Sequence, residues 1–156
     1  MREGKLVFRA LLIAGLVVAP LLLGGFAAKP LTSKPVEVTV TGIDYAFVGV
    51  PPQMRAGQAV LSFRNAGKVR HELVVARLAP GTTPEQIVEK LKKGALPRDV
   101  IIAGGLLFAN AGESSPVRLS LRLERGEKYM IYCNFQDTLT APRHWALGMY
   151  SGFSVK

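Results

Sequence analysis

Residues 117–133, VRLSLRLERGEKYMIYC, contain the clearest strand pattern in this sequence. From residue 117 to residue 123, valine or leucine alternates with arginine or serine, which is the two-residue period of a strand with one buried face. A turn signal at residues 125–126, Arg-Gly, follows, and apolar residues then share one face again over residues 129–133. This stretch therefore predicts two successive strands joined by a short turn.

The chain outside this stretch shows the same alternation in shorter runs. Turn-forming Gly, Pro and Asn residues separate these runs, and two consecutive prolines at residues 51–52 stop any ladder there. The further predicted strands cover residues 36–41, 43–47, 59–63, 71–75 and 152–155. Many short strands with turns at this spacing are typical of an antiparallel β-sandwich or barrel. We therefore predict an all-β fold.

One short helix is predicted to interrupt the strands, over residues 83–94. Thr83 can cap its first turn, Pro84 suits the first helical position, and Gly94 can end it. Its apolar stripe consists of Ile87, Val88 and Leu91. We expect this stripe to pack across one side of the sandwich.

The N-terminal segment has the composition of a leader. Residues 10–28 carry no charge, and Arg2, Lys5 and Arg9 outweigh Glu3 before them, which predicts a secretory signal peptide or an N-terminal membrane anchor over residues 1–28. The proline-containing residues 29–35 then predict a short stiff linker, followed by one domain over residues 36–156. The protein is thus expected to be exported to the periplasm or another extracytoplasmic space, and whether the leader is cleaved stays open.

Composition and charge exclude several classes of protein. A hydrophobic fraction of 49% in 156 residues excludes a disordered chain. The sequence has no second long apolar run, which excludes a multi-span membrane protein. The net charge is +9, of which +7 remains without residues 1–28. Because the Lys and Arg residues are scattered singly, we expect no nucleic-acid partner. The charge instead fits acidic protein partners, an anionic membrane surface or ordinary solubility.

The chemistry-bearing residues are few and occur in an informative order. The sequence has one cysteine, Cys133, and two histidines, His71 and His144. Ten residues separate Cys133 from His144, and four more separate His144 from Met149. An electron-transfer copper site uses two imidazoles, one thiolate and a weak axial thioether. Each residue alone is weak evidence, but together they follow the order that such a site requires.

Several segments of the chain resemble the cupredoxins, the family of plastocyanin and azurin. Residues 65–75, NAGKVRHELVV, resemble the segment that carries the family's first histidine, and residues 112–115 resemble the lead into the strand before the copper loop. Tyr132-Cys133, His144 and Gly148-Met149 resemble the loop itself. The resemblance covers about residues 36–156.

The resemblance implies a fold, a cofactor and a function. The fold would be an antiparallel Greek-key β-sandwich with one short helix. One copper ion would be bound by His71, Cys133, His144 and Met149. The protein would be no enzyme, and would shuttle single electrons between redox proteins with acidic docking surfaces. His144 would lie at the surface, within an apolar rim formed by Pro142, Trp145, Ala146 and Leu147.

Other functions remain open from the residues alone. An exported copper carrier or store would deliver metal rather than electrons, although such proteins often show Met- or His-rich tracts and this chain has neither. A metal-free β-sandwich could act as an interaction module. A hydrolase with Cys133 as nucleophile is disfavoured, because such a thiolate is usually assisted by a helix N-terminus or a cation, and Cys133 ends a predicted strand. A zinc site is also disfavoured, because a thioether is a poor zinc ligand.

Overall fold

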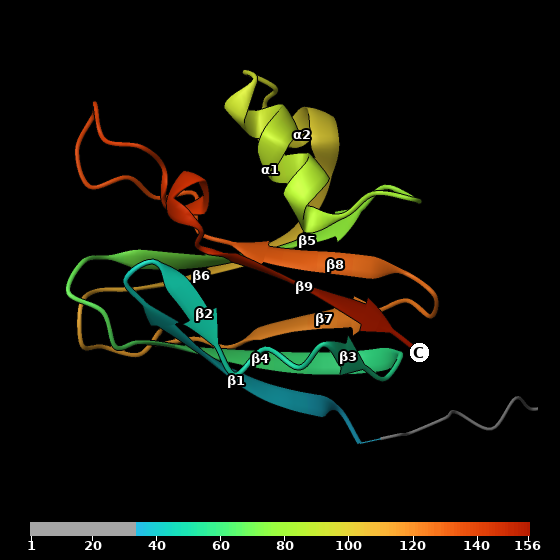
Figure 1. Ribbon diagram of the computed structural model, residues 1–156. Coiled ribbons are helices and arrows are strands. Elements are labelled where there is room, and N and C mark those ends of the chain that lie inside the picture. The colour runs from blue at the N-terminus through green and yellow to red at the C-terminus, as the bar shows by residue number, and fades with distance from the viewer. Residues whose placement is uncertain (1–33) are drawn as a thin grey trace, which may run out of the picture. The chain divides into compact units, whose positions relative to one another are not determined.

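In the computed structural model, residues 34–156 form a β-sandwich of two sheets, with helices on the outside of one sheet (Figure 1). The predicted leader, residues 1–28, and most of the predicted linker lie outside the described residues. Within residues 34–156, no helix is both long enough and apolar enough to cross a membrane. A signal peptide or anchor at the N-terminus therefore stays a prediction.

The first sheet has four strands in the order β2-β1-β4-β7. These strands are β1 (Val36–Ile43), β2 (Ala46–Val48), β4 (Gly57–Asn65) and β7 (Leu119–Leu123). Alternate residues of β1 and β4 are buried, as their two-residue period predicts. β1 and β4 run parallel, whereas β4 and β7 run antiparallel.

The second sheet has five strands in the order β3-β9-β8-β5-β6. These strands are β3 (Gln53–Met54), β5 (His71–Leu78), β6 (Ile101–Ala109), β8 (Lys128–Tyr132) and β9 (Tyr150–Val155). β5 lies between β8 and β6 and runs antiparallel to both. The sheet therefore places the first residue of β5 beside the end of β8.

The predicted sandwich is confirmed, but both sheets are mixed rather than wholly antiparallel. The pairs β1–β4 and β3–β9 are parallel. The alternation of apolar and polar residues identifies the buried face of a strand but carries no information about the direction of its neighbour. Strand β6 was not predicted, because its Gly104-Gly105 pair and long apolar run mask any alternation.

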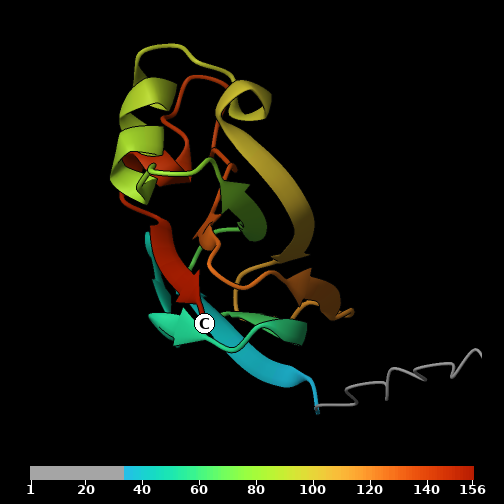
Figure 2. The ribbon, with the colours of Figure 1, turned by 90° about the vertical axis from the view of Figure 1, so that its right-hand side faces the viewer.

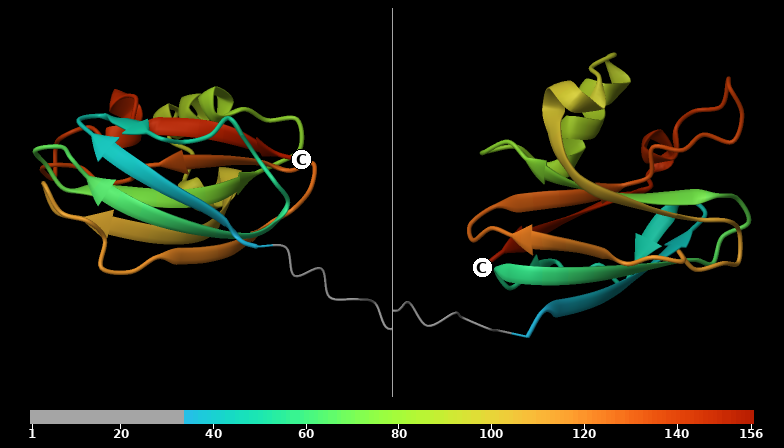
Figure 3. Two further views of the ribbon diagram at one scale, coloured as in Figure 1. Left: turned by 90° about the horizontal axis from the view of Figure 1, so that it is seen from below. Right: turned by 180° about the vertical axis from the view of Figure 1, so that it is seen from behind.

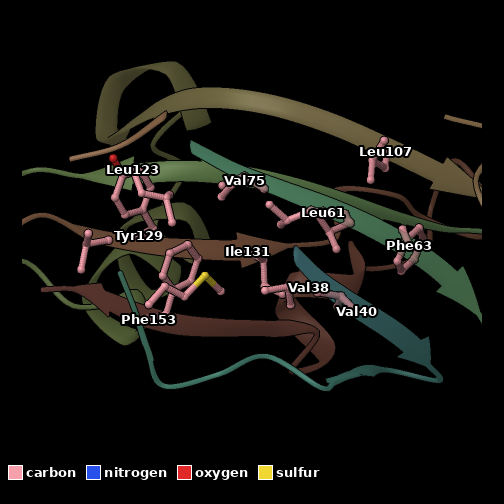
Figure 4. Packing of buried hydrophobic residues seen from close by; sticks show 14 of the residues in the cluster. Val38, Val40, Leu61, Phe63, Val75, Leu107, Leu123, Tyr129, Ile131 and Phe153 are labelled. Atoms are coloured by element: carbon pink, nitrogen blue, oxygen red, sulfur yellow. The ribbon is translucent and has the colours of Figure 1, made fainter. Parts of the chain in front are cut away.

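The main core fills the space between the two sheets (Figure 4). Its side chains come from the inward faces of both sheets, and include Val40, Leu61, Phe63, Leu73, Val75, Leu107, Ile131 and Phe153. Each of these residues is at most 4% exposed. Burial of this many large apolar side chains fixes the register of the strands, because a shift by one residue would turn them outward.

Helix α1 (Pro84–Lys92) lies over the outer face of the five-stranded sheet (Figure 2), and a second apolar cluster fills the space beneath it. Thr83 caps α1 in a capping box with Gln86, and the predicted stripe is buried. A four-residue helix, α2 (Pro97–Val100), follows it. The cluster comprises Val74, Ala76, Leu78, Ile87, Val88, Leu91, Ile101, Met130, Tyr132 and Trp145.

Three connecting segments meet at one end of the sandwich. They are the β1–β2 turn, the β4–β5 loop, and the segment from the end of β8 to β9, which contains the 3₁₀ turn η1 (His144–Leu147). Figure 1 and the view from behind in Figure 3 both show these segments at the same end. All four residues predicted as metal ligands belong to strands or loops that reach this end.

Candidate metal centre

His71 is the first residue of β5 and is fully buried. Its position is set by Asn65, which is also fully buried at the end of β4. The Asn65 amide donates to the carbonyls of Val69, at 2.7 Å, and Ala109, at 3.0 Å, while its oxygen accepts from the backbone N–H of Gly67 at 2.9 Å. These bonds fix the β4–β5 loop that leads into His71.

Cys133 directly follows β8 and is also fully buried. Its backbone N–H donates to the carbonyl of Met149 at 3.1 Å, and its carbonyl accepts from the N–H of Trp145 at 2.9 Å. The sulfur accepts from the backbone N–H of Glu72 on the neighbouring strand, with 3.2 Å between N and Sγ. Burial raises the pKa of the thiol to about 11, so the thiol keeps its proton at neutral pH unless a metal displaces it.

His144 opens the 3₁₀ turn η1 and is fully buried, which contradicts the expected surface position. Its backbone N–H donates to the carbonyl of Phe135 at 2.9 Å, so the segment between these two residues closes on itself and brings Phe135 to the His144 imidazole. The rings of Tyr45 and Phe135 contact the imidazole edge-on, with centroid distances of 4.7 and 5.7 Å. Burial lowers the pKa of His144 despite the opposing effect of Asp137, which favours a neutral imidazole.

The structure brings both histidines and the cysteine together at one point. The Nδ1 atoms of His71 and His144 are 3.1 Å apart, and the Sγ of Cys133 is 3.3 Å from Nδ1 of His144. The ligand atoms of the three residues all lie within 4.8 Å of one another. Of the four residues predicted as ligands, these three therefore form a cluster of the size that a single metal ion needs.

Each imidazole also has a carboxylate partner that the sequence analysis did not predict. Nε2 of His71 lies 2.9 Å from Oδ1 of Asp44, and Nε2 of His144 lies 3.1 Å from Oδ1 of Asp137. Burial acts to raise the pKa of Asp44, but the backbone N–H of Lys68 and the His71 imidazole outweigh it and lower the pKa. Asp44 is therefore ionised at neutral pH. Asp44 and Asp137 lie 27 and 7 residues from their histidines, so no spacing in the sequence links them.

The donor set of this cluster fits a metal ion. A carboxylate can only accept, so both histidines must donate from Nε2, and in an imidazole that carries its single proton there the Nδ1 atom is a lone-pair acceptor. Two acceptors 3.1 Å apart make no hydrogen bond to each other, and the single thiol proton of Cys133 can satisfy only one of them. A cation between the three atoms satisfies all of them. The buried arrangement therefore fits a metal site.

Met149 lies opposite Cys133 across the β8–β9 ladder. The backbone bond from Cys133 to Met149 continues the register in which Tyr132 pairs with Tyr150. Directly opposite residues of an antiparallel pair project to the same face, so the thioether and the thiol lie on one side of the sheet. Met149 is fully buried, and Gly42, which has no side chain, leaves space for its methyl group. Its role as an axial ligand stays a prediction.

The apolar rim expected around His144 is only partly exposed. Trp145 is 9% exposed, packs in the cluster under α1, and donates its indole N–H to Oδ1 of Asn134 at 3.2 Å. Trp145 is therefore a core residue, which contradicts its expected surface position. Leu147 remains at the surface, 44% exposed, and Leu139 on the loop is 97% exposed.

Comparisons with known proteins relate the fold to solved structures. No protein-family model and no curated protein sequence matches the chain. The solved structures with a similar fold include auracyanin B, with a TM-score of 0.50 and 20% identity over 78% of this chain and 88% of that one. Rusticyanin from Thiobacillus ferrooxidans has a TM-score of 0.51 and 17% identity, over 80% of this chain and 79% of that one. A structure of reduced rusticyanin also has a TM-score of 0.51, at 18% identity, with the same two shares covered.

These structures define the class of fold. Auracyanin and rusticyanin are cupredoxins, and the chain therefore has the cupredoxin fold, as its resemblance to that family predicted. The His71, Cys133 and His144 cluster fits a blue copper site. An identity of 20% or less shows the fold alone, so the function is argued from the cluster.

Proposed function

We propose that the domain binds one copper ion through His71, Cys133 and His144, with Met149 as a weaker axial ligand, and carries single electrons between redox proteins. The observation that carries this proposal is the meeting of two imidazole nitrogens and one thiol in a fully buried cluster. Two imidazoles, a thiolate and a thioether suit copper, whereas structural zinc sites use four imidazole or thiolate ligands.

The residues of the cluster provide what electron transfer requires. A bound copper ion would supply the one-electron change between Cu(II) and Cu(I). His71 and Cys133 come from paired strands of one sheet, so their separation is fixed by the backbone ladder. His144 and Met149 are buried against the same end of the sandwich. Complete burial of all four side chains excludes water from the site and resists rearrangement between redox states.

The alternatives explain less of this arrangement. A copper carrier or store must release its metal, and the burial of every candidate ligand opposes release. A metal-free interaction module would gain nothing from two converging imidazole lone pairs. The fold likeness to reduced rusticyanin, a protein whose structure was determined in a reduced state, also supports a redox role, and the protein would be no enzyme by itself.

The partners would be redox proteins with acidic docking surfaces. The chain carries a net charge of +9, and three exposed basic residues, Lys68, Arg70 and Arg143, lie on the loops that surround the cluster. The Arg70 guanidinium lies 5.7 Å from the centroid of Phe135, which covers His144. Positive groups at this end would steer acidic partners toward the site. The predicted leader supports export, with the domain periplasmic or attached to a membrane.

Addition of Cu(II) to residues 29–156 tests the metal. We expect one equivalent to bind and to give strong thiolate-to-copper absorption in the visible range. Cys133→Ser should abolish this absorption while circular dichroism shows the β-sandwich retained. A colourless wild-type domain whose thiol reacts freely after copper addition would contradict the proposal.

A further inference from the structure

Two neighbouring residues of the β1–β2 turn are each connected to one histidine by hydrogen bonds. Asp44 accepts directly from Nε2–H of His71, at 2.9 Å. Tyr45 donates its hydroxyl to Oδ2 of Asp137 at 2.8 Å, and the other oxygen of Asp137 accepts from Nε2–H of His144 at 3.1 Å. We propose that this turn is a positioning element that orients both imidazoles, Asp44 directly and Tyr45 through Asp137. The inference rests on the proposed function, since it explains how the cluster is held ready for metal.

The Asp44 carboxylate is held by backbone. Both of its oxygens accept from the N–H of Lys68, at 3.1 and 3.0 Å. Gly67 leaves the space that this requires, because a Cβ atom there would overlap Oδ1 of Asp44 and lie 2.8 Å from Nε2 of His71. His71 therefore meets an acceptor that its own loop fixes in place.

The Asp137 carboxylate depends on a side chain instead. Asp137 lies on the loop between β8 and η1, and the hydroxyl of Tyr45, 92 residues away in sequence, ties this loop to the β1–β2 turn. The hydrogen bond to Asp137 is the main cause of the raised pKa of Tyr45, so the proton stays on the hydroxyl, which is the donor of this bond. Without the hydroxyl, the carboxylate would keep His144 as its partner but lose its own anchor.

The hydroxyl and the ring of Tyr45 have separate roles. The ring contacts both imidazoles edge-on, with centroid distances of 6.1 Å to His71 and 4.7 Å to His144. Tyr45→Phe keeps these ring contacts and removes only the anchor of Asp137. Asp137→Ala removes the acceptor itself. The two variants therefore act on the same histidine to different degrees, and Asp44→Ala acts on the other histidine.

Nitrogen chemical shifts of the imidazoles in the metal-free protein test the inference without copper. In the wild type, we expect both histidines to carry hydrogen on Nε2. Asp137→Ala should shift His144 toward a mixture of tautomers and leave His71 unchanged, and Asp44→Ala should do the reverse. Tyr45→Phe should produce a smaller change at His144. A Nδ1–H tautomer of either histidine in the wild type would overturn the inference.

Cu(II) affinity provides the second measurement. Loss of a partner outside the ligand shell typically weakens metal binding about 10–100-fold. We expect a loss of this size for Asp137→Ala and a smaller one for Tyr45→Phe. Tyr45→Phe should add nothing in the Asp137→Ala background, because the hydroxyl acts only through that carboxylate.

A tyrosine elsewhere supplies the matched control. The hydroxyl of Tyr129 accepts from the backbone N–H of Glu124 at 3.1 Å, at the end of β8 away from Cys133. Tyr129→Phe should leave both tautomers and the Cu(II) affinity unchanged. An equal effect of Tyr129→Phe and Tyr45→Phe would overturn the inference. The expected tautomers in a protein that binds no copper would instead contradict the proposed function and leave the positioning role standing.

Discussion

The two halves of the metal cluster are held in different ways. The strand half, His71 and Cys133, lies where the adjacent strands β5 and β8 meet, and its spacing follows from the backbone ladder between them. The loop half begins at His144, which follows a ten-residue segment, residues 134–143, that pairs with no strand, and it ends at Met149, where the backbone bond to Cys133 rejoins the β8–β9 ladder. Side-chain bonds and buried rings hold this segment instead, through Tyr45, Asn134 and Trp145 in the described part of the chain.

This difference shows which interactions set the site. Core packing fixes the strand half, because β5 and β8 each contribute side chains to both apolar clusters. A few specific contacts fix the loop half, so single substitutions there should move one ligand without unfolding the sandwich. The exception is Trp145, which joins the loop half to the cluster under α1.

Trp145→Ala should have the largest effect on stability, because it removes the anchor of the loop half. Truncation of a buried aromatic side chain typically costs about 3–5 kcal/mol in the free energy of unfolding. Leu147→Ala, in the same 3₁₀ turn but exposed, should change it by no more than about 0.5 kcal/mol. Denaturant unfolding of both variants measures the difference. Equal stabilities would mean that Trp145 is a surface residue after all.

Much of this arrangement could be predicted from the sequence, because burial leaves a pattern. Alternation identified most strands, and the order of His71, Cys133 and His144 identified three residues that the structure brings into one cluster. The features that were not predicted are contacts between distant segments, which leave no periodic pattern in the sequence. The parallel pairing of β1 with β4, the burial of His144 and the carboxylate partners all depend on how distant segments meet.

Trp145 illustrates this limit in a single residue. Its neighbours in the sequence are Ala146 and Leu147, and together they look like an exposed apolar rim. The 3₁₀ turn separates them, because it directs Trp145 toward α1 and leaves Leu147 in solvent. A strand or helix period would have distinguished the two faces, but a four-residue turn is too short to show one.

Asn65→Ala tests the anchor of the strand half. The change leaves the buried carbonyl of Ala109 and the N–H of Gly67 without their partner, which should cost about 2–3 kcal/mol in the free energy of unfolding. Asn134→Ala removes a single bond to Trp145 in the loop half, and should cost about 1 kcal/mol. Thermal or denaturant unfolding of the two variants compares the halves directly. A larger loss of unfolding free energy for Asn134→Ala than for Asn65→Ala would show that the loop half is the more strongly anchored of the two.

Met149→Leu should separate packing from ligand chemistry within the loop half. Leucine has a similar volume, so the free energy of unfolding should fall by less than about 1.5 kcal/mol. Loss of the thioether should raise the reduction potential of the copper-loaded domain with its colour retained. Met130→Leu, in the cluster under α1, is the matched control and should leave the potential unchanged. An unchanged potential in Met149→Leu would show that Met149 only fills space.

Ionic strength should have the smallest effect on the stability of the fold. Its effect should instead be on the rate at which the domain meets a redox partner. With a net charge of +7 without residues 1–28, and basic residues Lys68, Arg70 and Arg143 around the loop half, electron exchange of the domain with an acidic redox protein should slow steeply as salt rises. Leu147→Ala should slow exchange at every salt concentration, because it removes apolar contact and no charge. Stopped-flow oxidation of the reduced domain across a salt series measures both effects. Rates that stay flat with salt would assign the charge to solubility, and an unaffected Leu147 variant would place docking away from the loop half.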